Sequence, residues 1–195
     1  MAMTSKYGFV YKRHLTPGVA TPATLEVIIS NSAAALTIGD KVQWTGGYLM
    51  GSAIDAACLG ILVGFVTKNG ENIFKTKDSI SGTKSGDDTY NAAGDNQTVD
   101  QVKGVVIVDT MALFQAYCSA GALTQAMVGG WFLGAVADGT YCDSVNYTTA
   151  QGAWSVGTQD FQLVELVTTL EDGSTSTTCG LFRIGRSQLL NDVTI

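Results

Sequence analysis

The chain contains a single histidine, His14, and histidine is the residue that most often serves as a general base near neutral pH. A serine or cysteine nucleophile in this chain would therefore depend on His14. His14 follows Lys12 and Arg13 in a segment that we expect to be a mobile arm, and a mobile arm does not hold a catalytic group in position. The G-x-S-x-G nucleophile motif is also missing. We expect no catalytic residue and no enzymatic activity.

Acidic side chains are the second candidates, because paired carboxylates carry out glycoside hydrolysis. Three of them lie beside glycine in turn signals, where Asp hydrogen-bonds the local backbone: Asp40, Asp138 and Asp172. Asp109 differs because it ends a buried apolar run. Distances between carboxylates cannot be read from a sequence, so a carboxylate pair stays open at this point.

Metal ligation and cofactor binding find little support. The four cysteines, Cys58, Cys118, Cys142 and Cys179, form no C-x-x-C pair, and one histidine cannot complete a zinc-finger set. Cys58 and Cys118 lie in apolar runs, which predicts buried free thiols. Asp87, Asp88 and Asp95 have no EF-hand spacing and are interpreted as solvated carboxylates. We expect no metal site and no cofactor.

Charge is sparse and uneven. Only 14% of the residues are charged, against about 25% in a typical soluble domain. Residues 104–182 contain no Lys or Arg and seven acids, so their formal charge of −7 exceeds the −6 of the whole chain. Such a segment repels nucleic acid. Because few charges leave a surface poorly solvated, we expect a partner to cover part of it. No signal peptide and no apolar run of about 20 residues is present, so we expect no membrane contact.

Short apolar runs bounded by glycine predict an all-β barrel or sandwich of eight to ten strands. The stretch from Leu36 to Phe65 organises it, with a hairpin turn at Gly46-Gly47 and a central apolar strand over residues 59–67. A short helix capped by Thr124 and ending at Gly129 is also expected. The other expected strands span 25–30, 36–45 (a strand pair), 48–50, 104–109, 113–118, 131–136, 140–156 (short strands around polar turns), 161–170 (where a helix also fits the pattern) and 179–184.

Two segments stand outside this pattern. Residues 1–24 are expected to form an N-terminal arm before a barrel domain over 25–195, with a turn at Thr16-Pro17-Gly18. The arm either grips a neighbouring subunit or folds back on its own barrel. Within the domain, residues 68–103 are expected to form one long polar surface excursion, whose polar stretch begins at residue 75.

Tryptophan is the remaining candidate for ligand binding. Trp44, Trp131 and Trp154 could form a platform for a sugar, although tryptophans spread over strands are more often core residues. An exposed tryptophan would favour a carbohydrate-binding module.

Several segments, taken in order, resemble small structural proteins of tailed bacteriophages. They are YGFVYKRHL, ALTIGDKVQW, LGILVGF, GVVIVDTMALFQAY, FQLVELV and LFRIGRSQL. Together they are similar to head-decoration or auxiliary capsid proteins, and the resemblance touches most of the chain outside residues 68–103. It implies a single small β-barrel or β-tulip-like domain with an extended N-terminal arm and one long polar loop.

The resemblance further implies a structural protein on the outer surface of the virion, made in the bacterial cytoplasm. It would bind the major capsid protein, stabilise the shell and assemble as a homo-oligomer, with a trimer favoured. The arm would make the contact, through Lys6, Tyr7, Phe9, Tyr11, Lys12 and Arg13. A head–tail connector or tail component is the alternative within the virion, and a carbohydrate-binding module is the alternative outside it.

Overall fold

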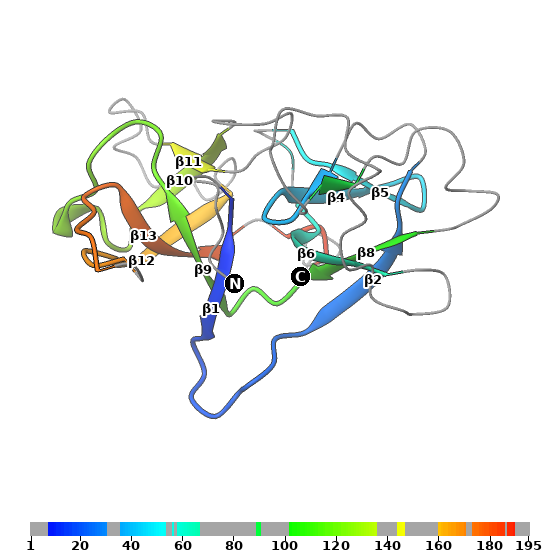
Figure 1. Ribbon diagram of the computed structural model, residues 1–195, viewed down its shortest axis with the longest axis horizontal. Helices are drawn as coiled ribbons and strands as arrows, with labels where there is room; N and C mark the ends of the chain where they lie inside the picture. Colours follow the sequence, from blue (N-terminus) through cyan, green and yellow to red (C-terminus); the bar gives the residue numbers. More distant parts are fainter. Residues whose placement is uncertain are drawn as a thin grey trace, which may run out of the picture.

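The computed structural model describes residues 8–30, 36–53, 56, 58–66, 89–90, 102–135, 144–146, 160–170, 173–185 and 187–189. Over these residues the chain is all-β, with one 3-10 turn and no α-helix. An antiparallel sheet of six strands and one of five lie side by side (Figure 1), and a separate pair of short strands completes the fold. The predicted all-β class is confirmed.

The five-stranded sheet has the order β2-β8-β6-β4-β5. Its centre is β6, which comes from the apolar run that the sequence analysis placed at the heart of the fold. The β4–β5 hairpin turns at Gly46 and Gly47, whose φ angles of 60° and 89° match the expected glycine turn. The five strands are β2 (Thr24–Ile28), β4 (Lys41–Thr45), β5 (Tyr48–Gly51), β6 (Gly60–Val66) and β8 (Lys103–Ile107).

The six-stranded sheet has the order β1-β9-β13-β12-β10-β11. It curls so that its edge strand β11 returns toward the end of β9, where Cys118 and Val145 form a single parallel bridge. One bridge does not make a continuous ladder, so no closed barrel is found in the described chain. The six strands are β1 (Val10–His14), β9 (Ala112–Tyr117), β10 (Trp131–Ala135), β11 (Ser144–Asn146), β12 (Phe161–Leu166) and β13 (Cys179–Ile184).

The remaining strands form a small pair, β3 (Leu36–Thr37) with β7 (Thr89–Tyr90). Strand β7 lies inside the segment 68–103 that was predicted to be a polar excursion. Apart from residues 89–90 and 102–103, that segment lies outside the described residues.

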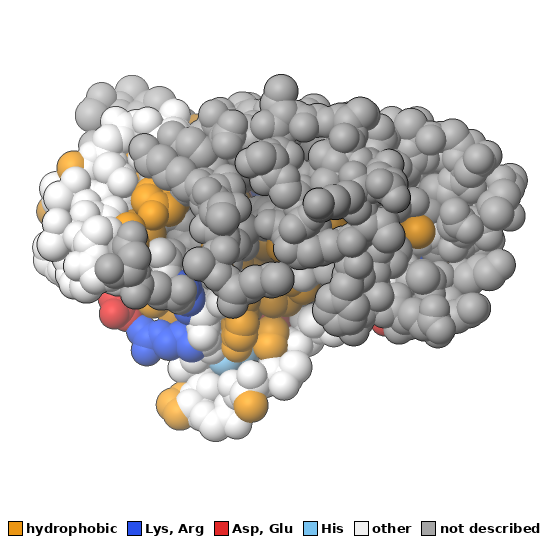
Figure 2. Space-filling model, viewed as in Figure 1, with side chains coloured by type: hydrophobic (Ala, Val, Ile, Leu, Met, Phe, Trp, Pro, Cys, Tyr) orange, Lys and Arg blue, Asp and Glu red, His pale blue; other side chains and the backbone are white. Residues whose placement is uncertain are grey.

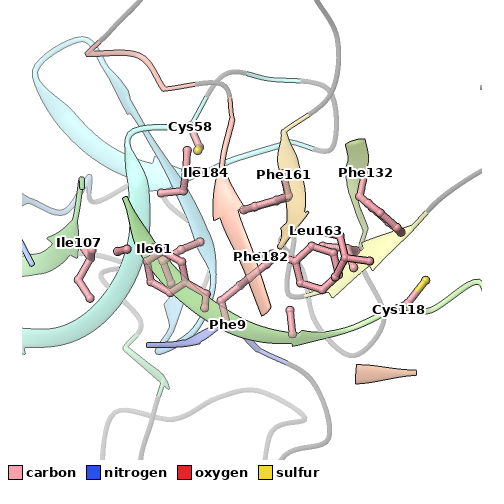
Figure 3. Close-up of a cluster of buried hydrophobic side chains, with 14 of the residues drawn as sticks. Phe9, Cys58, Ile61, Ile107, Cys118, Phe132, Phe161, Leu163, Phe182 and Ile184 are labelled. Carbon is pink, nitrogen blue, oxygen red and sulfur yellow. The ribbon is translucent and has the colours of Figure 1, made fainter. Parts of the chain in front are cut away.

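Two apolar clusters hold the sheets. The larger cluster lies between the sheets and contains Phe9, Phe114, Phe132, Phe161 and Phe182, together with Ile61 and Ile107 from the five-stranded sheet (Figure 3). The smaller cluster covers the other face of the five-stranded sheet and includes Leu62 and Val106. Neighbouring residues of β6 and β8 thus point into different clusters, as the two-residue period of a strand requires. The five-stranded sheet is therefore buried on both faces at its centre.

Two expected elements differ from the prediction. The predicted helix is only a 3-10 turn, Gln125–Met127, and the Thr124 side chain makes no capping hydrogen bond. The run 161–170 is a strand, as favoured, but it ends at Leu166, and the chain beyond it turns at Gly173 with a φ of 81°. No helix in the described ranges is long and apolar enough to cross a bilayer.

The segment expected to be an arm contributes a strand to the fold. Strand β1 pairs along β9 at one edge of the six-stranded sheet. Just before it, Phe9 is 1% exposed and stacks on Phe161 with ring centroids 4.5 Å apart. Of the two alternatives for this segment, residues 8–14 follow the one in which the chain folds back on its own sheet.

Candidate functional site

The single histidine is fixed in place, not carried on a mobile arm. His14 ends β1, and its side chain is only 7% exposed. Its Nδ1 accepts the Thr16 backbone N–H at 2.9 Å, so we assign the ring proton to Nε2, which donates to Asp109 Oδ2 at 3.0 Å. Because both ring nitrogens are engaged, His14 has no nitrogen left to deprotonate a nucleophile.

Asp109 holds both ends of the connection between β1 and β2. Its Oδ2 accepts from His14 before the loop and from the Ala23 backbone N–H after it, at 3.4 Å. Its Oδ1 accepts the Met111 N–H at 2.8 Å. Burial raises the pKa of this carboxyl, but the Met111 and Ala23 N–H groups and the nearby His14 outweigh burial and hold the pKa below its ordinary value. Asp109 therefore acts as an ionised clamp at the base of the loop.

The connection that Asp109 clamps, residues 15–21, protrudes from the molecule, and we call it the tip loop. It projects from the lower side in Figure 1, between β1 and β2, and carries hydrophobic atoms at its end in Figure 2. Thr16 and Val19 close the predicted Pro17-Gly18 turn, with a Gly18 φ of 86° that fits a type II turn. Every residue of the tip loop is exposed.

Three of the five exposed large hydrophobic residues in the described chain lie on or beside the tip loop. Leu15 is 38% exposed, Val19 39% and Met111 43%, and the Leu15 N–H donates to the Met111 carbonyl oxygen at 2.9 Å. Isolated exposed apolar residues are ordinary, whereas three that lie together make this part of the described surface a candidate for contact with a partner. These residues were missed by the sequence analysis, although Leu15 and Val19 flank the predicted turn.

The predicted contact residues divide between core and surface. Phe9 is a core residue, and Tyr11 is half-buried with its ring edge-on to Phe114. Lys12 is half-buried, and Arg13 is exposed and forms an ion pair with Glu165. Lys6 and Tyr7 lie outside the described residues. Arg13 is thus the member of the set, among those described, that is exposed for contact.

The described tryptophans also differ in their exposure. Trp44 on β4 is 43% exposed, and its backbone N–H and carbonyl pair with the side-chain amide of Gln188 at 2.7 and 3.1 Å. Trp131 is half-buried and packs on Gly185, where a β-carbon would overlap its ring. Trp154 lies outside the described residues. A three-tryptophan platform is not seen in the described chain.

One buried ion pair joins the two sheets. Lys41 at the start of β4 and Asp160 just before β12 are both 0% exposed, and Lys41 Nζ lies 2.5 Å from Asp160 Oδ2. Lys41 Nζ also donates to the Ala53 carbonyl oxygen at 3.1 Å. Neither residue was singled out from the sequence, because 119 positions separate them.

The remaining candidate residues have structural roles or lie outside the described residues. Asp40 is buried and accepts the Thr37 N–H at 2.7 Å, which is the local turn role predicted for it. Asp138 and Asp172 lie outside the described residues. Cys58, Cys118 and Cys179 are buried thiols that form no disulfide, as predicted for the first two, and burial raises the pKa of the Cys179 thiol. The described residues contain no group of three or more His, Cys, Asp or Glu side chains arranged to hold a metal ion.

No protein-family model, no curated protein and no solved structure matches this chain. The case for a function therefore depends on the tip loop, the exposed Trp44 and the resemblance described above.

Proposed function

We propose that this protein is a non-enzymatic structural component of a phage virion that binds the outer surface of the capsid and stabilises the shell. The observation that carries the proposal is the tip loop, which presents Leu15 and Val19 on a rigid turn beside Met111. Because Asp109 holds both ends of the tip loop, the loop loses little conformational entropy on binding. Its apolar contacts therefore contribute to affinity. The contact surface in this proposal is the tip loop with Arg13, in place of the whole segment 6–13.

The β-barrel or β-tulip-like body belongs to the same proposal. The six-stranded sheet is its best candidate, because the bridge between Cys118 and Val145 brings the edge strand β11 back to the end of β9. The Ser119 N–H reinforces that junction by donating to the Val145 carbonyl at 2.8 Å. The major capsid protein is the proposed partner, and a trimer at a symmetry axis of the shell is the proposed assembly.

Copy number per particle is the direct test. Quantitative mass spectrometry of purified virions should find the protein in hundreds of copies, in a simple ratio to the major capsid protein. A dozen copies or fewer would place it in the neck or tail instead. Absence from the particle would refute every virion function.

The contact surface is tested by adding charge to the tip loop. We expect Leu15→Asp with Val19→Asp to reduce co-sedimentation with capsids at least about tenfold, since each buried aliphatic side chain contributes about 1.5 kcal/mol or more. The matched control adds the same two charges at Thr175 and Thr177, which are exposed on the turn between β12 and β13. Equal loss in both variants would indicate nonspecific repulsion and would remove the tip loop from the proposal.

Deleting the first 19 residues would not test the contact surface cleanly. That deletion removes Phe9 from the larger cluster and β1 from its sheet. Loss of a buried phenylalanine alone costs about 3–5 kcal/mol, so reduced binding could come from unfolding. The tip-loop substitutions avoid this problem because they change exposed side chains.

A carbohydrate-binding module is a second candidate, favoured by one observation. Trp44 is 43% exposed, as that function requires, and aromatic faces stack on sugar rings. Acrylamide should quench Trp44 fluorescence in the variant Trp131→Phe with Trp154→Phe. Protection from acrylamide by an oligosaccharide from a host-surface array would support this candidate, and unchanged quenching with all of them would exclude it.

A further inference from the structure

The buried pair Lys41–Asp160 has surroundings that are unusual for an ion pair. Both side chains are 0% exposed, so neither charge is solvated, and burying two charges costs several kcal/mol per ion before their attraction is counted. The pair sits where the two sheets meet, with Lys41 on β4 of the five-stranded sheet and Asp160 leading into β12 of the six-stranded sheet. Nitrogen and oxygen are 2.5 Å apart.

The backbone fixes both residues. Asp160 N–H donates to the Phe132 carbonyl at 3.1 Å, and its carbonyl accepts the Gly185 N–H at 2.7 Å. The carbonyl of Lys41 accepts the Ser52 N–H at 3.0 Å. The reactive groups are oriented as well, since Nζ donates to the Ala53 carbonyl at 3.1 Å and Oδ2 accepts the Gly134 N–H at 3.3 Å. Two reactive groups are thus held in contact in a dry site.

We propose that Lys41 and Asp160 condense into an intramolecular amide bond that joins the two sheets covalently. A proton first passes from the Lys41 ammonium to the Asp160 carboxylate across their contact, which gives a neutral amine and a carboxylic acid. The Nζ lone pair then attacks Cγ. An Nζ–Cγ bond forms, one Cγ–O bond and one N–H bond break, and one water molecule leaves. The step is redox-neutral and needs no other reactant.

Four features of the site favour this condensation. Burial withholds solvation from both charges, and proton transfer across the contact removes both charges at once. Fixed contact between the reacting groups replaces a bimolecular encounter, and such proximity is worth effective molarities on the order of 10⁵ M or more. The Gly134 N–H donates to Oδ2, the oxygen that takes the proton from Nζ and leaves as water, and so stabilises negative charge on the leaving oxygen. Exclusion of bulk water from the site opposes hydrolysis of the product.

Intact-mass spectrometry of the full-length folded protein tests the proposal. We expect a mass below that of the sequence by one water molecule, and a digest in which the peptide containing Lys41 is joined to the peptide containing Asp160. Trypsin should also fail to cut after Lys41. A chain with the full mass of its sequence and no joined peptide would overturn the proposal and leave a buried ion pair.

Lys41→Arg is the matched control, because it keeps the positive charge but its guanidinium does not condense with a carboxylate. This variant should show the full mass. If it also lacks one water, the loss arises elsewhere, for example by cyclisation at Asp138-Gly139, and the proposal fails. Wild-type protein that is purified in denaturant, and has not folded before, supplies the time course. Its water loss should begin only on refolding, since the reaction requires the folded contact.

Discussion

Among single residues, Asp109 shows how a side chain that suggested catalysis serves a structural purpose. A carboxylate at the end of a buried strand, next to the only histidine, has the composition of a catalytic dyad. Both nitrogens of His14 are used within the protein, however, and the carboxylate also accepts N–H groups from Ala23 and Met111. The group stabilises the tip loop by accepting hydrogen bonds while ionised.

The lowered pKa of Asp109 predicts a pH dependence of stability. A group whose pKa is lower in the folded state stabilises the fold above its unfolded pKa, here the ordinary 3.8, and this contribution is lost as the pH falls below that value. Asp109→Asn should therefore lower the free energy of unfolding at pH 7 by about 1.5 kcal/mol, typical of hydrogen bonds to a charged group. The difference from wild type should shrink below pH 3.8 in urea titrations at several pH values.

Glu165→Gln is the control for this experiment, since it removes one negative charge at a residue whose side chain is 54% exposed and pairs with Arg13 on the surface. Exposed ion pairs contribute about 0–1 kcal/mol. The free energies of unfolding of the Asp109→Asn and Glu165→Gln variants should thus differ at pH 7 and become similar in acid. A constant difference between Asp109→Asn and wild type down to pH 2 would show that Asp109 does not act through its ionised form.

For single residues, the sequence predicts local roles better than it predicts contacts between residues that are far apart in the chain. The turn role of Asp40 and the burial of Cys58 and Cys118 depend on neighbours in the chain, and both predictions are confirmed. The pairing of His14 with Asp109 joins residues 95 positions apart, and that of Lys41 with Asp160 joins residues 119 apart. Such contacts follow from strand order, which no local pattern specifies.

Among the elements, β6 is the strand most sensitive to substitution because it lies at the centre of the five-stranded sheet. Its two glycines have different surroundings. A β-carbon at Gly60 would overlap the carbonyl oxygen of Ile107 in the neighbouring strand β8. A β-carbon at Gly64 would have only the Val105 β-carbon in reach, at 3.9 Å. Gly60 therefore permits close packing of β6 on β8, whereas Gly64 does not limit it.

The different surroundings of Gly60 and Gly64 predict effects of different size for the same glycine-to-alanine substitution. Gly60→Ala should lower the free energy of unfolding by about 3 kcal/mol, because the backbone of β8 must move away to relieve the overlap. Gly64→Ala on the same strand should stay within about 1 kcal/mol of wild type, since alanine loses less conformational entropy than glycine. Urea denaturation of both variants measures the difference. Equal destabilisation would mean that β6 and β8 do not pack as described.

The elements were largely predictable, and their pairing was not. Residues 179–184 and the Gly46-Gly47 hairpin match the prediction, because hydrophobic runs and glycine turns are local signals. The sequence of the first 24 residues fitted both a gripping arm and a segment folded back on its own domain, and the pairing of β1 with β9 and the stacking of Phe9 on Phe161 distinguish them. The sequence left a barrel and a sandwich open, and it did not show how the strands divide between the two sheets.

In the whole molecule, the larger cluster makes the two sheets interdependent. The side chains of Ile61 and Ile107 extend from the five-stranded sheet and pack among phenylalanines of the six-stranded sheet (Figure 3). The chain also crosses between the sheets twice, from β1 to β2 and from β8 to β9. Neither sheet can unfold without exposing apolar surface of the other. The two sheets should therefore unfold as one cooperative unit.

Tryptophan supplies a reporter in each sheet for the last prediction. Trp44 lies on β4 of the five-stranded sheet and Trp131 on β10 of the six-stranded sheet. One variant carries Trp131→Phe and Trp154→Phe, and the other carries Trp44→Phe and Trp154→Phe. In each, the urea midpoint from fluorescence should coincide with the midpoint from far-UV circular dichroism. Comparison within one variant removes any effect of the substitutions on stability, such as loss of the Trp131 contact with Gly185. Separate midpoints within either variant would show that the sheets unfold independently and that the larger cluster does not couple them.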